Sequence, residues 1–184
     1  MKKGLFVLMI LLSSKVFAQS ENYRAFKVDL MGGWAMPAGV GSTTKGGINF
    51  SIEPKYNITD NLALSYKYEG AILVSADVQG ADGDNLVSLN TSHLVGAEYY
   101  FGDRTVRPFV GAGVGFYHPR YIRVDSELNS LDDLNAGRGF KAGFAPRAGL
   151  QIGHFRLAAE YNQVKNNSYW GFKMGFTLGG GRIE

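Results

Sequence analysis

The feature that most constrains this chain is an alternation of apolar and polar residues with a period of two, repeated in segment after segment. In one such segment, Leu64 and Tyr66 alternate with Ser65 and Lys67. Successive side chains of a β-strand point to opposite faces, so each of these segments has one apolar and one polar face. The pattern predicts an all-β protein.

Eight segments carry this pattern, with turn-forming residues between them. They are residues 24–36, 47–56, 62–74, 87–101, 107–117, 140–152, 155–164 and 170–178. The connections after the second, fourth and sixth segments are short, whereas 37–45, 75–85 and 118–139 are longer. Within the longest connection, Leu128, Leu131 and Leu134 recur every third residue, which predicts a short surface helix.

The first 18 residues have the pattern of a secretory signal peptide. Lys2 and Lys3 form a basic start, residues 4–12 are apolar, and Val16 and Ala18 are the small residues expected before a cleavage site. The apolar run is too short to span a bilayer, which takes about 20 residues. We therefore expect a signal peptide at 1–18, cleaved after Ala18, and one mature domain at 19–184.

Charge and cysteine content exclude several classes of function. The precursor has 19 basic and 16 acidic residues. Three of the bases, Lys2, Lys3 and Lys15, leave with the signal peptide, so the mature domain is formally neutral. A nucleic-acid partner is not expected, because nucleic-acid-binding domains carry a basic excess. The chain has no cysteine, which excludes disulfides and thiolate metal sites.

In the strand cores, the apolar register carries no Asp, Glu, Lys or Arg, and twelve charged residues lie on the polar register. Burying one of them in lipid costs about 2–4 kcal/mol for Arg or Lys at the midplane, and a slip of one residue would turn the whole set outward. We expect them to form a paired network in a narrow lumen. They are Lys27, Asp29, Glu53, Lys55, Lys67, Glu69, Glu98, Lys141, Arg147, Arg156, Glu160 and Lys173.

The fold prediction is a closed eight-stranded antiparallel up-and-down transmembrane β-barrel, because only helices and closed barrels satisfy every backbone group in lipid. Large aromatic residues near the strand ends predict the two interfacial belts of such a barrel. The belt residues are Trp34, Tyr56, Tyr99, Phe101, Phe116, Phe155 and Trp170. A water-soluble barrel or sandwich, with the apolar face as its core, is the alternative.

Several stretches resemble the small outer-membrane β-barrel family, which includes the OmpA transmembrane domain, OmpX, OmpW and the opacity proteins. The fourth and fifth strands of that family are similar to EYYFG at 98–102 and RPFVGAGVGF at 107–116. Its turn between strands two and three resembles YNITDNL at 56–62. PRAG at 146–149 and AEY at 159–161 resemble strands six and seven of the family, and GF at 175–176 with GGG at 179–181 resembles the last strand as it ends in Bacteroidetes-type members. Many members end on an aromatic residue, whereas this chain ends Arg182-Ile183-Glu184.

No residues in the sequence form a recognisable catalytic, cofactor-binding or metal-binding pattern. Gly111, Gly113 and Gly115 are not followed by the third glycine and helix of a phosphate-binding fingerprint. Some barrels of this size are lipid A deacylases with a His and a Ser two residues apart. Ser92 and His93 are adjacent here and so face opposite sides. We therefore expect a protein that is not an enzyme and has no cofactor.

Two functions fit the sequence. The first is a structural or loop-presenting membrane protein for envelope integrity or surface interaction, with residues 118–139 as the main exposed loop. The alternative is an OmpW-like conduit for small apolar molecules, suggested by Leu73 and Leu94 on the polar register. The expected location is the bacterial outer membrane after Sec-type export. Outer-membrane lipid and lipopolysaccharide are the expected partners, and a monomer is expected.

Overall fold

The computed structural model describes residues 22–38, 44–76, 85–102, 105–124, 131–134, 139–165 and 167–183. The signal peptide and its cleavage site lie outside these residues. The strands that form the wall are β1 (Phe26–Pro37), β2 (Thr44–Asn57), β3 (Leu62–Ala76), β4 (Asn85–Tyr100), β5 (Val106–Val124), β7 (Lys141–Ile152), β8 (Phe155–Val164) and β9 (Tyr169–Gly179). Within the described part, no helix is long and apolar enough to cross a membrane.

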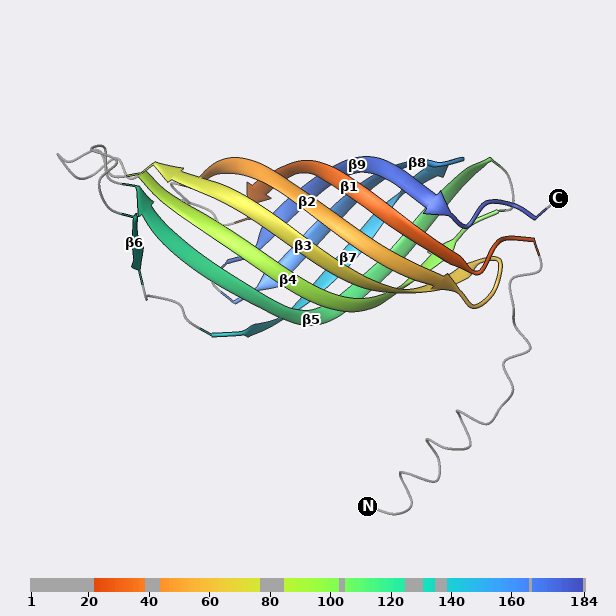
Figure 1. Cartoon of the computed structure of the whole chain (residues 1–184), viewed down its shortest axis with the longest axis horizontal. Helices are drawn as coiled ribbons and strands as arrows, with labels where there is room; N and C mark the ends of the chain where they lie inside the picture. Colours follow the sequence, from red (N-terminus) through yellow and green to blue (C-terminus); the bar gives the residue numbers. More distant parts are fainter. Residues whose placement is uncertain are drawn as a thin grey trace, which may run out of the picture.

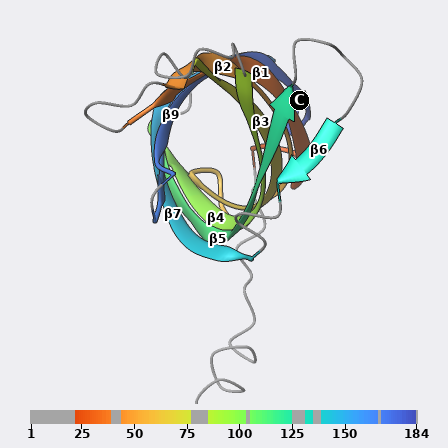
Figure 2. The same cartoon turned by 90° about the vertical axis from the view of Figure 1, so that its left-hand side faces the viewer.

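The eight wall strands form a closed antiparallel barrel (Figures 1 and 2). Each strand pairs with its neighbours along the chain, and β1 pairs with β9 over Lys27–Pro37 to close the ring. Closure removes every long free edge, which is the condition for a sheet to sit in lipid. The predicted fold class is confirmed.

One end of the barrel carries the short turns together with the first and last described residues, and at the other end β3, β4 and β5 project furthest (Figure 1). We call these the turn end and the loop end. The Asn57–Leu62 turn is held by backbone bonds from Ile58 and Thr59 to the Leu62 carbonyl. Gly153 allows the tight turn before β8 because its φ is +58°, a value that L side chains rarely adopt.

The loop end differs from the prediction in two ways. β5 continues to Val124 instead of ending at Tyr117, so part of the predicted 118–139 loop is strand. The predicted surface helix is wrong where it is described: Leu131–Leu134 forms β6, which pairs with Tyr121–Val124. β7 pairs with β5 only up to Tyr117, so the free edge of β5 above that point is covered by β6.

The two faces of the wall have opposite chemistry. On β3, Leu64 is 49% exposed and Tyr66 45%, whereas Lys67 is 1% exposed and Glu69 is fully buried. The same alternation holds along the other wall strands, so the apolar register points outward and the charged register points into the lumen. This orientation is that of a membrane barrel and the reverse of a water-soluble one.

Candidate functional site

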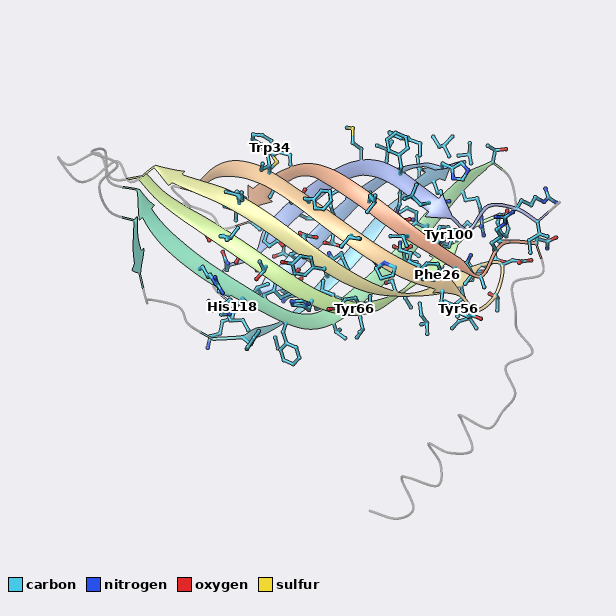
Figure 3. The ribbon with its side chains drawn as sticks, viewed as in Figure 1. Phe26, Trp34, Tyr56, Tyr66, Tyr100 and His118 are labelled. Carbon is cyan, nitrogen blue, oxygen red and sulfur yellow. The ribbon has the colours of Figure 1, made fainter. Side chains whose placement is uncertain are left out.

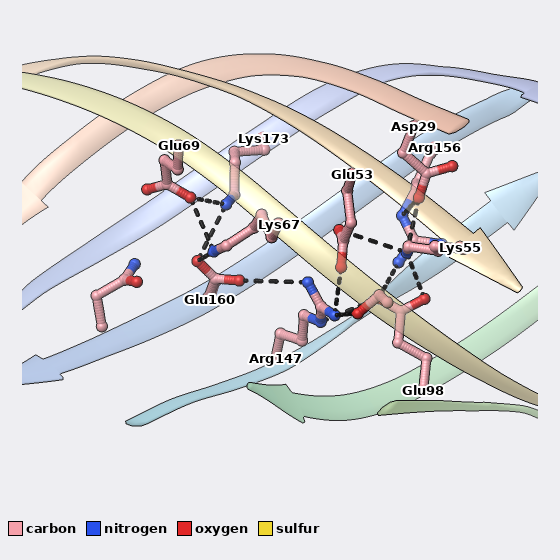
Figure 4. Close-up of polar contacts among 12 residues, drawn as sticks. Asp29, Glu53, Lys55, Lys67, Glu69, Glu98, Arg147, Arg156, Glu160 and Lys173 are labelled. Atoms are coloured by element: carbon pink, nitrogen blue, oxygen red, sulfur yellow. Dashed lines mark hydrogen bonds and ion pairs between the residues drawn. The ribbon is translucent and has the colours of Figure 1, made fainter. Parts of the chain in front are cut away.

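The lumen holds an ion-pair network built from five carboxylates and five cationic side chains (Figure 4). It divides into a group near the turn end, a group nearer the middle, and one arginine that joins them. Charges removed from water are tolerated only when they are paired and hydrogen-bonded, and this balance meets that condition. The members are Asp29, Glu53, Lys55, Lys67, Glu69, Glu98, Arg147, Arg156, Glu160 and Lys173.

Glu98 is the centre of the group near the turn end. The Lys55 Nζ lies 2.6 Å from Glu98 Oε2 and 2.7 Å from Asp29 Oδ2. Arg156 donates from Nη2 to Glu98 Oε1 at 2.5 Å, and its Nε lies 3.1 Å from Asp29 Oδ2. The Tyr100 hydroxyl donates to Glu98 Oε2 at 2.6 Å. Two acids are thereby shared between two bases and a phenol.

The middle group pairs two lysines with two glutamates. Lys173 Nζ lies 2.6 Å from Glu69 Oε2 and 3.0 Å from Glu160 Oε1. Lys67 binds the same two carboxylates. The Tyr169 hydroxyl donates to Glu69 Oε1 at 2.9 Å. Each of the two ammonium groups is therefore paired with both carboxylates, so the group has two positive and two negative charges that are all in contact.

Arg147 on β7 connects the two groups (Figure 4). Its guanidinium lies 2.5 Å from Glu53 Oε1, 3.0 Å from Glu98 Oε1 and 3.7 Å from Glu160 Oε2. It also donates to the Ser65 hydroxyl at 2.9 Å. The planar fork of arginine can reach several carboxylates at once, which a lysine at this position could not do in the same geometry.

Two of the twelve lumen residues expected from sequence have other roles. Lys27 is buried with its Nζ 4.0 Å from the centre of the Tyr100 ring, a cation–π contact. Lys141 is half-buried at the loop end and donates to the Lys165 carbonyl at 3.3 Å. The other ten residues are those of the network.

Sequence reasoning missed the large lumen side chains that seal the two ends of the network. Phe109 on β5 packs against Arg156, with 3.6 Å between the guanidinium carbon and the ring centre. Tyr117 donates to Asn162 Oδ1 at 2.7 Å on the loop side. Gly143 lies beside the Tyr117 ring, where an added Cβ would be 2.5 Å from a ring carbon. The sequence did hold a signal for these two side chains. Phe109 and Tyr117 occupy the same alternate positions of β5 as Gly111, Gly113 and Gly115, so they face the lumen with those glycines.

Above the network, toward the loop end, the lumen contains apolar and neutral polar groups. Leu73, Leu94, Tyr117, Val164 and Tyr169 belong to one buried cluster. Further along the lumen wall lie buried polar side chains that have atoms without a hydrogen-bond partner in the described part of the protein. They are Asn49, Ser88, Asn90, Ser92 and Asn162. Ion pairs therefore do not fill the lumen from end to end.

The predicted belt residues lie on the outer surface, most of them near strand ends; Phe116 lies within β5, which runs on to Val124, but it is level with the start of β7. Tyr56, with Phe26 beside it, lies toward the turn end, and Trp34 lies toward the loop end (Figure 3). Several belt residues pack in pairs: Tyr99 lies edge-on to Phe101 at 5.2 Å, and Trp170 contacts Tyr161 at 4.8 Å between ring centres. The remaining predicted belt residues, Phe116 and Phe155, pack against Phe140 and Phe176 respectively.

Ser92 points into the lumen and His93 points outward, where it accepts or donates a 2.6 Å bond with the Tyr66 hydroxyl. Among the described residues, no three His, Cys, Asp or Glu side chains are placed to hold a metal ion.

Residues 4–181 match the family described as outer membrane protein beta-barrel domain. The chain belongs to this family. The match covers nearly the whole chain and agrees with a closed barrel whose apolar face is outward. This family member is therefore a protein of the bacterial outer membrane, and the family consists largely of structural, non-enzymatic barrels. No curated protein matches the chain.

Solved structures of outer-membrane barrels share this family member's fold at low sequence identity. Neisserial surface protein A is 19% identical with a TM-score of 0.54, and the match covers 86% of this chain and 99% of that one. OprG from Pseudomonas aeruginosa is 13% identical with a TM-score of 0.50, covering 88% and 99%.

Proposed function

We propose that this protein is a closed membrane anchor that presents its loop-end strands and connections at the cell surface. The observation that carries the proposal is the ion-pair network across the lumen. Seven of the eight wall strands contribute a member to it, and the eighth, β5, contributes glycines such as Gly111 that make room for Glu98. An eight-stranded barrel has an interior that side chains just fill.

The strands at the loop end support a presenting role. β3, β4 and β5 continue as a paired sheet to Ala76, Asn85 and Val124, beyond the level at which β7 begins (Figure 1). β6 adds a further strand to this extension. The result is a raised sheet on one side of the barrel mouth, which gives the adjoining connections a rigid base for contact with a surface partner or lipopolysaccharide.

The presenting role is tested by replacing residues 125–138 with a Gly-Ser linker of about ten residues, which is long enough to return from Val124 to the start of β7 opposite Tyr117. The ring of eight wall strands does not need β6 for closure, so we expect the variant to insert and to remain heat-modifiable on gels. When this variant is expressed in a deletion strain, we expect it to restore detergent resistance, because the wall is intact. We expect it not to restore adhesion or partner binding, because the presented segment is gone. Recovery by this variant of every surface function that the deletion strain has lost would contradict the proposal.

A closed lumen also predicts the absence of steady ion flow. Purified protein in planar bilayers should give no large, stable conductance steps, because the network leaves its carboxylates and ammonium groups paired and occupies the lumen. Arg147→Gly/Glu160→Gly, which removes side chains from the network, serves as the opened comparison. Stable wild-type steps as large as those of the double variant would show that the lumen is open.

One observation favours a second candidate function, a conduit for small apolar molecules. The buried apolar cluster at the loop end reaches the wall at Val164, which also lines a shallow groove of about 550 Å³ between β7 and β8. The strand pairing there passes from Phe144 with Gln163 directly to Arg147 with Glu160, because Pro146 has no N–H to donate. A weakened seam beside apolar lumen residues is where a lateral exit would form.

The conduit is tested by measuring entry of an apolar fluorescent dye into cells with and without the protein. A conduit predicts faster entry with wild type, and slower entry when Leu73 is replaced by Asn, since a polar group in the cluster disfavours an apolar solute. Equal rates in cells with and without the protein would rule this function out.

A further inference from the structure

A second hollow lies at the turn end, outside the charge network. It has a volume of about 230 Å³, enough for one or two small amino-acid residues. Its lining includes Thr105, Arg107, Gln151, His154, Arg182 and the glycine tail 179–181. No acidic residue lines it, and two arginines do. The hollow is therefore a cationic cavity that opens on the side of the short turns.

Residues 22–24 and the segment after β9 together build one wall of this cavity. Tyr23 forms a β-bridge with Arg182, the Arg24 N–H donates to the Gly181 carbonyl at 3.0 Å, and the Ile183 N–H donates to the Asn22 carbonyl at 2.8 Å. Gly180 has a φ of +65°, and an added Cβ there would come within 2.7 Å of Lys27. The tail after β9 is thus a folded part of the barrel mouth.

Arg107 is held rigidly inside the cavity. Its Nε donates to the Gly102 carbonyl at 3.1 Å, and one terminal nitrogen donates to the Asp60 carbonyl. Its guanidinium carbon lies 4.2 Å from the ring centre of Tyr23 and 4.9 Å from that of Tyr100. A guanidinium has five N–H donors, and these two bonds use only part of them. The remaining N–H donors of Arg107 are therefore held in a fixed position from which they can bind an anion.

The cavity also offers a hydrogen-bond acceptor that lacks a donor. Gln151 donates from Nε2 to the Gly153 carbonyl at 3.1 Å, but its buried Oε1 has no partner among the described residues. A buried acceptor without a donor is unfavourable, so an occupant that supplies one is favoured. The His154 Nδ1 donates to the Thr177 carbonyl at 2.9 Å, which leaves Nε2 available to an occupant.

We propose that this cavity binds a small carboxylate that carries a neighbouring N–H donor, the chemistry of the C-terminus of a short peptide. The arginines take the carboxylate, since a guanidinium matches its planar geometry, and Gln151 Oε1 accepts the peptide N–H. Short turns of outer-membrane barrels face the periplasm, so the ligand comes from that compartment. The site lies at the opposite end from the loop-end surface of the proposed function and does not depend on it.

The test is a titration of the refolded mature chain in lipid nanodiscs with N-acetyl-Ala-Ala. We expect the free acid to bind at least about tenfold more tightly than its C-terminal amide, the ratio that about 1.4 kcal/mol gives. Arg182→Gln and Gln151→Leu should each weaken binding of the acid several-fold. Arg24→Gln is the matched control, because the exposed Arg24 side chain lies at the same end and does not line the cavity, and the substitution keeps the backbone N–H that binds Gly181.

Several results would overturn the proposal. These are equal binding of acid and amide, no binding of either, or a loss in Arg24→Gln as large as that in Arg182→Gln. Inorganic phosphate serves as the competing anion, and tighter binding of phosphate than of the peptide acid would overturn the assignment to a peptide terminus. Arg107 is left unchanged because it ties two turns together. Gel heat-modifiability confirms folding of each variant, and Gln151→Leu carries the test if Arg182→Gln fails to fold.

Discussion

Arg147→Gln is expected to lower the free energy of unfolding of the barrel by about 3–5 kcal/mol, the usual cost of breaking a buried charge pair from one side. Arg147 is the link between the two groups of the network, with Glu53 at 2.5 Å and Glu98 at 3.0 Å. Its removal leaves the five carboxylates of the network facing four cationic side chains, all of them buried. Urea-induced unfolding in lipid vesicles, followed by tryptophan fluorescence, measures the change.

Arg24→Gln is the control for this substitution. It removes the same charge from an exposed position, where a change within about 0.5 kcal/mol is expected. The double variant Arg147→Gln/Glu53→Gln restores the balance of charge and should recover part of the lost stability, which a double-mutant cycle quantifies. Equal, small effects of Arg147→Gln and Arg24→Gln would mean that the network does not stabilise the barrel.

Val95→Arg is expected to lower the stability of the membrane-inserted barrel by about 2–4 kcal/mol. Val95 points outward, 57% exposed, between the two aromatic belts, and pairs with Tyr66 on β3 and Val114 on β5. An arginine there must place its guanidinium in the hydrocarbon region. The same unfolding assay in vesicles reports the cost.

The matched control is Val106→Arg. Val106 is 50% exposed and also faces outward, but it begins β5 at the turn end, where an interfacial arginine costs only about 0–1 kcal/mol. If the barrel lies in a membrane, the loss of stability should be larger for Val95→Arg than for Val106→Arg, because the two positions differ in their depth in the bilayer. If both variants were as stable as the wild type, the outer face would be in water.

The sequence was sufficient to predict the wall and its orientation. A strand has a side-chain period of two, so the register of Leu64 and Tyr66 against Lys67 and Glu69 fixes which face is buried for the whole strand. The short turns could also be located, because residues such as Asn57 and Gly153 carry local turn chemistry. These are properties of neighbouring residues in the chain.

The features that sequence could not predict depend on contacts between distant strands. Arg147 meets Glu53 and Glu98 only after the barrel closes, so its bridging role has no local signal. The leucine spacing at Leu131–Leu134 fits a helix, but the unpaired edge of β5 selects a strand. The turn-end cavity needs Tyr23 and Arg182 side by side, from opposite ends of the chain.

The outward direction of the apolar register is the claim most directly open to measurement. The chain has no cysteine, so single cysteines at positions 65 and 66 on β3 and at positions 92 and 95 on β4 can each carry a nitroxide label without background. In lipid vesicles, labels replacing Tyr66 and Val95 should be accessible to oxygen and shielded from a water-soluble nickel chelate, whereas those replacing Ser65 and Ser92 should be shielded from both. Nickel access at positions 65 and 92, with positions 66 and 95 shielded from both reagents, would contradict the account.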